Sequence, residues 1–393
     1  MSRLFASLEE LEEVTKDEED VNTKDKSIDD IVSMKMEADE LMNEIVDSLE
    51  ASADDFIELE SIIERLEALG VTIRKYGISQ AIMEAADPHN ELVAAGICGS
   101  YEELGKAIST EAYSETTLKN IDTAIEGIFD SIGNALGKAG DNMRDNAIKS
   151  EKANLIYTDA LTEINKKLSE SGITFDEAAF GKKSIRAYSK DEMKRAINAL
   201  DAVDHFVDAD VIQKAVNEFD KFIKGTDFKK ETADAIFNKF GDGMNKLFSN
   251  KDAIAVLGLE IVERTDNIIT HIKRVKPTID DNRDLAEKLG WSARDAHGLS
   301  KDIVTKLERT YGFSNEMRSL SKLAYDTASI IYKRRSTNND LSKEQSRIFN
   351  YGYGTLVDIF TLSRFIVNTT ITTLRNVASS ALEVSRAALA SKN

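Results

Sequence analysis

"SETTLKNIDTAIEGIFDSIGNALGKAGDNMRDNAIKSEKANLIYTDALTEINKKLSESG", residues 114–172, is the stretch that decides the fold. Its large apolar residues recur at spacings of three and four, the period of one face of an α-helix; they include Leu118, Ile121, Ile125, Ile128, Phe129, Ile132, Leu136, Met143 and Ile148. Gly133, Gly137 and Gly140 lie in the middle, and a glycine costs a helix about 1 kcal/mol. The glycines indicate close packing or a hinge near Gly140. We therefore expect one long helix over 114–171, or two helices in line.

The rest of the chain supports the same class. Only 2 of 393 residues are proline, which breaks helix interiors, while 41% are hydrophobic and 31% are charged. The sequence predicts an all-α, elongated multi-helix bundle. Beyond the central stretch, helices are expected from Ser27 to about 49, from about 54 until Gly70 stops the helix, from the capping box Ser189-x-x-Glu192 through Val207, and over 209–224, 228–248, 251–274, 278–290, 298–311, 314–333, 341–351 and 353–390. Residues 172–188 are the best candidate for irregular or short β structure.

Charge is unevenly distributed along the chain. The net charge is −19; residues 1–60 hold 21 Asp/Glu and 5 Lys/Arg, a net of −16, and residues 301–393 hold 8 Asp/Glu and 14 Lys/Arg, a net of +6. The acidic head could therefore shield the basic tail, within the chain or between copies. We divide the chain into an acidic flexible segment (1–30), an N-terminal helical region that is a possible propeptide (31–111), a central helical domain (112–275) and a C-terminal helical domain (276–393).

The basic tail offers one dense cluster, Lys333-Arg334-Arg335. It is a candidate contact for a polyanion such as DNA, because DNA binding rests on neutralising phosphates. The alternative is that it ends a helix, where cations suit the negative end of the dipole. A net-acidic chain favours the second interpretation, with DNA contact weak at most.

Two patterns resemble reactive centres. Cys98 is the only cysteine, which excludes an internal disulfide, and its neighbours are acidic rather than the electropositive groups that activate a thiol. Asp280-Asp281-Asn282-Arg283-Asp284 matches the DDxxD pattern of helical isoprenoid synthases, which hold Mg²⁺ and a diphosphate. Aspartates at a helix start are also expected as caps, and the partners elsewhere, Asp141-x-x-x-Asp145 or Asp17-x-x-Asp20, come without a basic diphosphate clamp. We expect no catalytic, cofactor or metal site, and hence no enzyme.

A membrane-active helical protein is a further alternative. The most apolar stretch, 355–371, is interrupted by Asp358 and Arg364, so it is expected to be an amphipathic core helix rather than a membrane span. No secretory leader is expected, and cysteine usage fits a reducing compartment.

This acid-headed, helical, cysteine-poor chain resembles the internal head and prohead-core proteins of large tailed bacteriophages. In some of these phages a protease removes a propeptide after a small-x-Glu sequence, and Ser109-Thr110-Glu111, followed by Ala112, fits that pattern, as do Ser7-Leu8-Glu9 and Ser48-Leu49-Glu50. The resemblance implies a structural or assembly role inside the capsid, with other protein subunits as partners, and cleavage after Glu111. The alternative is an intracellular helical scaffold or adaptor that is not viral, and the expected location of the chain is the inside of the capsid or the host cytoplasm.

Overall fold

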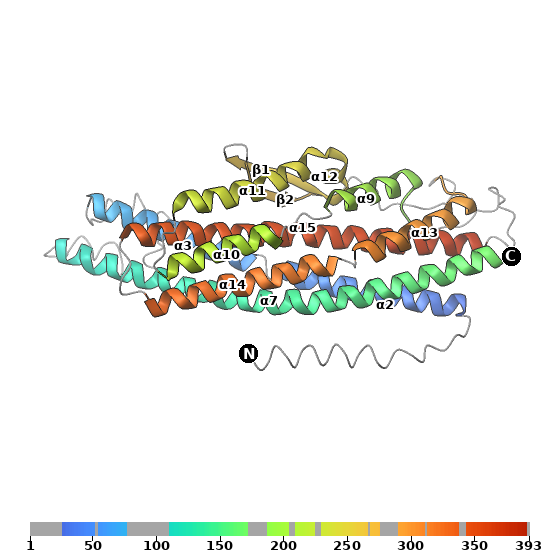
Figure 1. The fold of residues 1–393 in the computed structure, drawn as a ribbon, viewed down its shortest axis with the longest axis horizontal. Coiled ribbons are helices and arrows are strands. Elements are labelled where there is room, and N and C mark those ends of the chain that lie inside the picture. The colour runs from blue at the N-terminus through green and yellow to red at the C-terminus, as the bar shows by residue number, and fades with distance from the viewer. Residues whose placement is uncertain are drawn as a thin grey trace.

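The computed structural model describes residues 26–51, 54–76, 110–171, 187–203, 209–224, 229–265, 268–275, 290–310, 313–337 and 343–390. These residues form an elongated bundle of helices that run mainly along one long axis, with a small β-hairpin on one side (Figure 1). The prediction of an all-α multi-helix bundle is confirmed. Residues 1–25 of the acidic segment lie outside the described ranges.

The central stretch is one continuous helix, α7 (Thr110–Glu170), of 61 residues. At 1.5 Å per residue it is about 90 Å long. Its glycines allow a neighbouring helix, α14 (Ser314–Thr337), to approach closely. A Cβ on Gly133 would lie 3.2 Å from Ile331, and one on Gly140 would lie 3.1 Å from the Tyr325 ring. Of the two expectations, close packing is confirmed.

Two N-terminal helices, α2 (Ile28–Ala51) and α3 (Asp54–Tyr76), lie antiparallel to α7. Lys26 lies near Asp159 and Ser48 near Asn146, so position along α2 rises as position along α7 falls. Further along, a Cβ on Gly70 would contact Leu118 and Ile121. The prediction that Gly70 ends its helix is wrong, because this glycine is packed against α7 inside α3.

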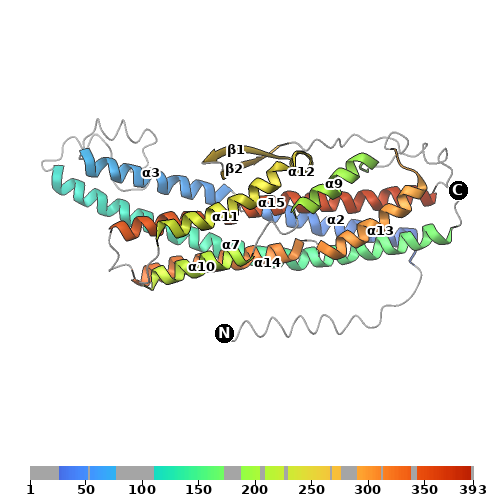
Figure 2. The same ribbon diagram turned by 45° about the horizontal axis from the view of Figure 1, so that its top comes forward.

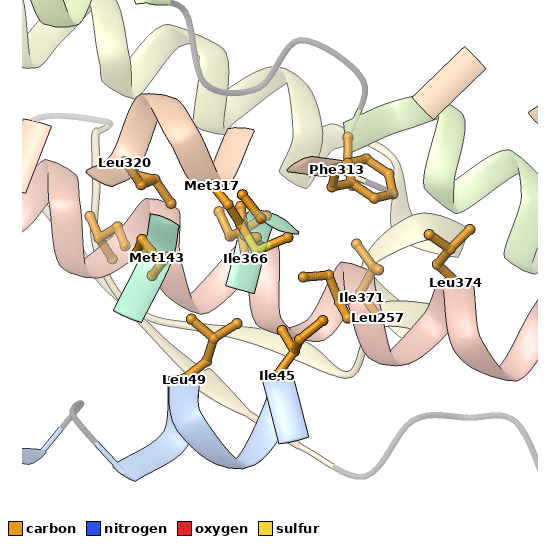
Figure 3. Close-up of a cluster of buried hydrophobic side chains, with 14 of the residues drawn as sticks. Ile45, Leu49, Met143, Leu257, Phe313, Met317, Leu320, Ile366, Ile371 and Leu374 are labelled. Carbon is orange, nitrogen blue, oxygen red and sulfur yellow. The ribbon is translucent and has the colours of Figure 1, made fainter. Parts of the chain in front are cut away.

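Helix α15 (Lys343–Ala390) runs through the middle of the bundle and is buried along most of its 48 residues. The expected break between 351 and 353 is absent. Figure 3 shows how side chains from several helices meet around α15 in the core; the labelled residues are Ile45, Leu49, Met143, Leu257, Phe313, Met317, Leu320, Ile366, Ile371 and Leu374. One hydrophobic cluster extends from Ile31 to Ala388, so the described parts of regions 31–111, 112–275 and 276–393 share a core.

The β-hairpin corrects the prediction of a helix over 251–274. Helix α11 (Lys230–Ser249) is followed by the short α12 (Lys251–Leu257), which ends at Gly258 in the left-handed conformation (φ 68°). Strands β1 (Leu259–Thr265) and β2 (Ile268–Arg274) then pair antiparallel, with Glu260 opposite Lys273. Left-handed glycine is a common helix stop, and the many β-branched residues that follow favour strand. Residues 172–186, most of the segment expected to be irregular or β, lie outside the described ranges.

The remaining helices are α9 (Lys190–Val203), α10 (Ala209–Ile223) and α13 (Ala293–Thr310). The capping box before α9 is confirmed: the Ser189 amide donates to Glu192 Oε2 at 2.8 Å, and the Glu192 amide donates to Ser189 Oγ at 3.2 Å. A second box, Ser292 with Asp295, starts α13 five residues before the expected position. Figure 2 shows that α14 and α13 run along α7. Helices α11, α12 and α9 lie on the side of the bundle that carries the hairpin.

Candidate functional site

The proposed processing site lies at the start of the longest helix. Glu111 and Ala112 belong to the first turn of α7, which begins at Thr110. Helix ends fray, and a protease that binds extended substrate would require this turn to open. The structure places the site at the boundary between the α2–α3 segment and the remainder of the bundle.

The basic cluster lies near the C-terminal end of α14, as the helix-end interpretation expected. Lys333 Nζ lies 2.5 Å from Asp220 Oδ1 on α10, and Lys224 binds the other oxygen of the same carboxylate. Hydrogen bonds from Lys224 and then Lys333 lower the pKa of Asp220 below its usual value. Lys333 is thus engaged within the chain, and the side chains of Arg334 and Arg335 are outside the described set.

Other cations of the C-terminal region also have partners from earlier parts of the chain. Lys306 and Arg309 on α13 both bind Asp201 of α9, and Lys306 is only 6% exposed. Arg318 of α14 lies 2.6 Å from Glu151 of α7. Lys306, Arg309, Arg318 and Lys333 are therefore paired with acidic side chains of earlier helices, which leaves less positive charge for a polyanion.

The described part of the acidic head pairs mainly with α7. Glu44 accepts from Lys149 at 2.6 Å, and Glu37 lies 2.9 Å from Lys152. The ion pair with α15 has the reverse polarity, because the cation belongs to α2: Lys35 Nζ lies 3.6 Å from Glu383 Oε1. Among the described residues, the acidic side chains of α2 therefore pair with cations of the central region, whereas the ion pair between α2 and the C-terminal region joins a head cation to a tail carboxylate, the reverse of the expected shielding.

A set of tyrosines ties helices together through carboxylates, and sequence reasoning missed it. The Tyr157 hydroxyl on α7 donates to Asp39 of α2 at 2.5 Å, and Tyr325 on α14 donates to Asp141 of α7 at 2.5 Å. On α15, Tyr351 donates to Asp234 of α11. The partners are 117 to 184 residues apart, so no local pattern could reveal them.

The electrostatics of these tyrosines argue for a structural role. Burial, and then the neighbouring carboxylate, raise the pKa of Tyr157 well above its ordinary value. Burial and the hydrogen bonds to Asp141 and Asp234 raise the pKa values of Tyr325 and Tyr351 to about 12. A phenol with so high a pKa stays protonated at neutral pH and is a poor base or nucleophile.

Of the sequence patterns that resemble metal or catalytic sites, only Asp141-x-x-x-Asp145 lies within the described ranges. Among the residues of those ranges, no group of three or more His, Cys, Asp or Glu side chains could hold a metal ion. Asp141 and Asp145 flank Arg144, whose nitrogens lie 3.5 and 3.8 Å from their carboxylates, and Asp141 also accepts from Tyr325. Cys98, the Asp17-x-x-Asp20 pattern and residues 280–284 lie outside the described ranges.

The most apolar stretch of the sequence, residues 355–371, lies within α15. No described helix combines the length and the apolar character needed to cross a bilayer. Within α15, Asp358 is exposed, whereas Arg364 is buried and lies 5.8 Å from the centroid of the Phe360 ring.

Comparisons of the chain with family models, with curated proteins and with solved structures found no match.

Proposed function

We propose that this chain is a non-enzymatic structural or assembly protein that acts through the outer surfaces of its helical bundle. The observation that carries the proposal is α7, a helix about 90 Å long that is packed along its length by α2, α3, α14 and α13. The residues of the core are committed to packing these helices. A long, rigid bundle presents separate surfaces to several neighbours, which suits an assembly component.

The ion pairs and tyrosine ties support the same proposal. They link helices from distant parts of the chain, such as α9 with α13 through Asp201 and α10 with α14 through Asp220. Exposed ion pairs each stabilise by only about 0.2–1 kcal/mol, but they specify which helices are neighbours. Four side chains with perturbed pKa values take part in these contacts, namely Tyr157, Asp220, Tyr325 and Tyr351.

The most specific form of the proposal is an internal head or core component of a bacteriophage virion, and it rests on the resemblance given above. Charge distribution supports it. Residues 1–111 hold 29 Asp/Glu and 9 Lys/Arg, a net of −20, and residues 112–393 hold 41 and 42, a net of +1. A cut after Glu111 would therefore divide the chain into an acidic part and a part near neutrality. If the acidic part then leaves, the near-neutral part is repelled less by packaged DNA.

Mass spectrometry of the protein from its native particle tests this proposal. The expected result is a peptide that begins at Ala112 and no peptide that spans Glu111 and Ala112. Recovery of an intact spanning peptide from purified particles would refute processing at this site. Absence of the protein from virus particles would refute the virion role.

The alternative is an intracellular helical scaffold or adaptor, which would use the same helical surfaces. Cross-linking in the producing cell distinguishes the two, because a scaffold would be linked to host proteins and a head component to capsid subunits. A helical diphosphate-binding enzyme is a more distant alternative. Calorimetry with Mg²⁺ and inorganic diphosphate, comparing the natural chain with Asp281→Asn, would reveal binding that depends on the DDxxD sequence.

A further inference from the structure

Helices α2 and α3 form a consecutive pair that packs against the rest of the bundle, α2 against α7 and α15 and α3 against α7. Helix α2 has 24 residues and α3 has 23, and their contacts with α7 extend from Tyr157 to Leu118. Their core-facing residues recur at spacings of three, four and seven and are at most 3% exposed; these are Ile31, Ala38, Met42, Ile45, Leu49, Leu66, Leu69 and Ile73. A buried apolar stripe of this kind on each helix has the composition of a protein–protein interface core.

The edges of this contact are polar and complementary. Against α7, Ser48 accepts from Asn146, Glu44 accepts from Lys149, and Asp39 accepts from Tyr157. Against α15, Arg375 donates to Asn43, and Lys35 lies 3.6 Å from Glu383. An apolar centre with a hydrogen-bonded rim is the anatomy of a stable interface between separate chains.

A single segment of the chain joins this helix pair to the rest of the bundle. Residues 77–109 join Tyr76 of α3 to Thr110 of α7, and the noncovalent contact extends over both helices. We infer that α2–α3 remains bound to residues 112–393 after the chain is cut anywhere between 77 and 111. Processing then yields a two-chain protein and does not release the acidic head.

This inference changes what the proposed cut would do. If residues 1–111 stay bound, their net charge of −20 stays too, and the product keeps the total of −19. Loss of the head would also uncover the apolar sides of α7 and α15 that meet Ile45 and Leu49 (Figure 3). The identity of the natural cut rests on the proposed function, but retention of the pair rests on the contacts alone.

A cut made in the purified full-length chain tests retention. A recognition sequence for a specific protease replaces a short stretch between 90 and 98, the chain is cut, and the product is examined by native size exclusion and by a denaturing gel. We expect one native species of unchanged mass and helicity that contains both fragments. Separation of the fragments under native conditions would overturn the inference, whatever the virion experiment shows.

Two methionines of α2 supply matched variants. Met42 is fully buried in the interface, and Met36 is 65% exposed. We expect Met42→Gln to raise the dissociation constant of the cut fragments at least about tenfold and Met36→Gln to leave it within about twofold. If Met42→Gln does not fold, Met42→Ala is carried through the same cut. Equal dissociation of the buried and exposed variants would refute this interface as the cause of retention.

Discussion

Gly140 and Gly137 of α7 form a matched pair for testing the close approach of α14. A Cβ on Gly140 would lie 3.1 Å from Cζ of Tyr325 and 3.2 Å from both Cε atoms, whereas a Cβ on Gly137 would meet no atom within 4 Å. Both glycines lie inside the same helix. Alanine in place of each therefore changes helix propensity equally but packing very differently.

The expected energies have opposite signs. Alanine is better than glycine in a helix interior by about 1 kcal/mol, so Gly137→Ala should stabilise by about 0.5–1 kcal/mol. At Gly140 the Tyr325 ring cannot withdraw freely, because its hydroxyl is bonded to Asp141, and the Ser321 hydroxyl donates to the Gly140 carbonyl at 2.7 Å. Overpacking costs about 1–3 kcal/mol, so we expect Gly140→Ala to destabilise by about 1 kcal/mol net.

Urea denaturation followed by far-UV circular dichroism measures both changes. A Tyr325→Ser background provides the control, because without the ring Gly140→Ala should stabilise as Gly137→Ala does. If Gly140→Ala stabilises the natural chain as much as Gly137→Ala, the proposed contact between α7 and α14 is wrong. If the Tyr325→Ser background leaves the effect of Gly140→Ala unchanged, the ring is not its cause.

Three further predictions concern titration, a buried cation and a helix stop. Folding raises the pKa values of Tyr325 and Tyr351 from near 10 to about 12, so their contribution to the free energy of unfolding is full below pH 10 and falls as pH rises towards 12. Tyr→Phe at either site should therefore make the denaturation midpoint fall less steeply over this pH range. Asp201→Asn should destabilise by about 1–3 kcal/mol in urea, because the nearly buried Lys306 loses its carboxylate, and no change would contradict that pairing. Gly258→Ala should cost about 1–2 kcal/mol in thermal unfolding, because φ is 68° there; an unchanged midpoint would refute the left-handed helix stop.

Local sequence patterns predicted most of the helices. They failed where the same residue type can lie either inside a helix or at its end. The Ser189–Glu192 capping box was predicted correctly because its groups are three residues apart. Glycine was ambiguous: Gly70 lies inside α3, whereas Gly258 ends α12 in the left-handed conformation. The difference depends on packing, since Gly70 is buried against α7.

Prediction of the candidate site was weaker for the same reason. The composition suggested that acidic and basic parts might meet, but the pairs themselves, such as Arg318 with Glu151, join residues 167 positions apart. The tyrosine–aspartate ties had no sequence signal at all. The sequence favoured a helix end for Lys333, but only the structure shows that Asp220 lies beside it.

The sequence by itself determined that this chain is helical, because the scarcity of proline and the three-to-four spacing of apolar residues act within single segments. It also determined how charge is distributed along the chain. Only the tertiary structure decided which helices are neighbours, where α7 and α14 approach over a glycine, and that α2–α3 completes the core. These features arise between segments far apart in sequence, and their energies depend on distances that only folding sets.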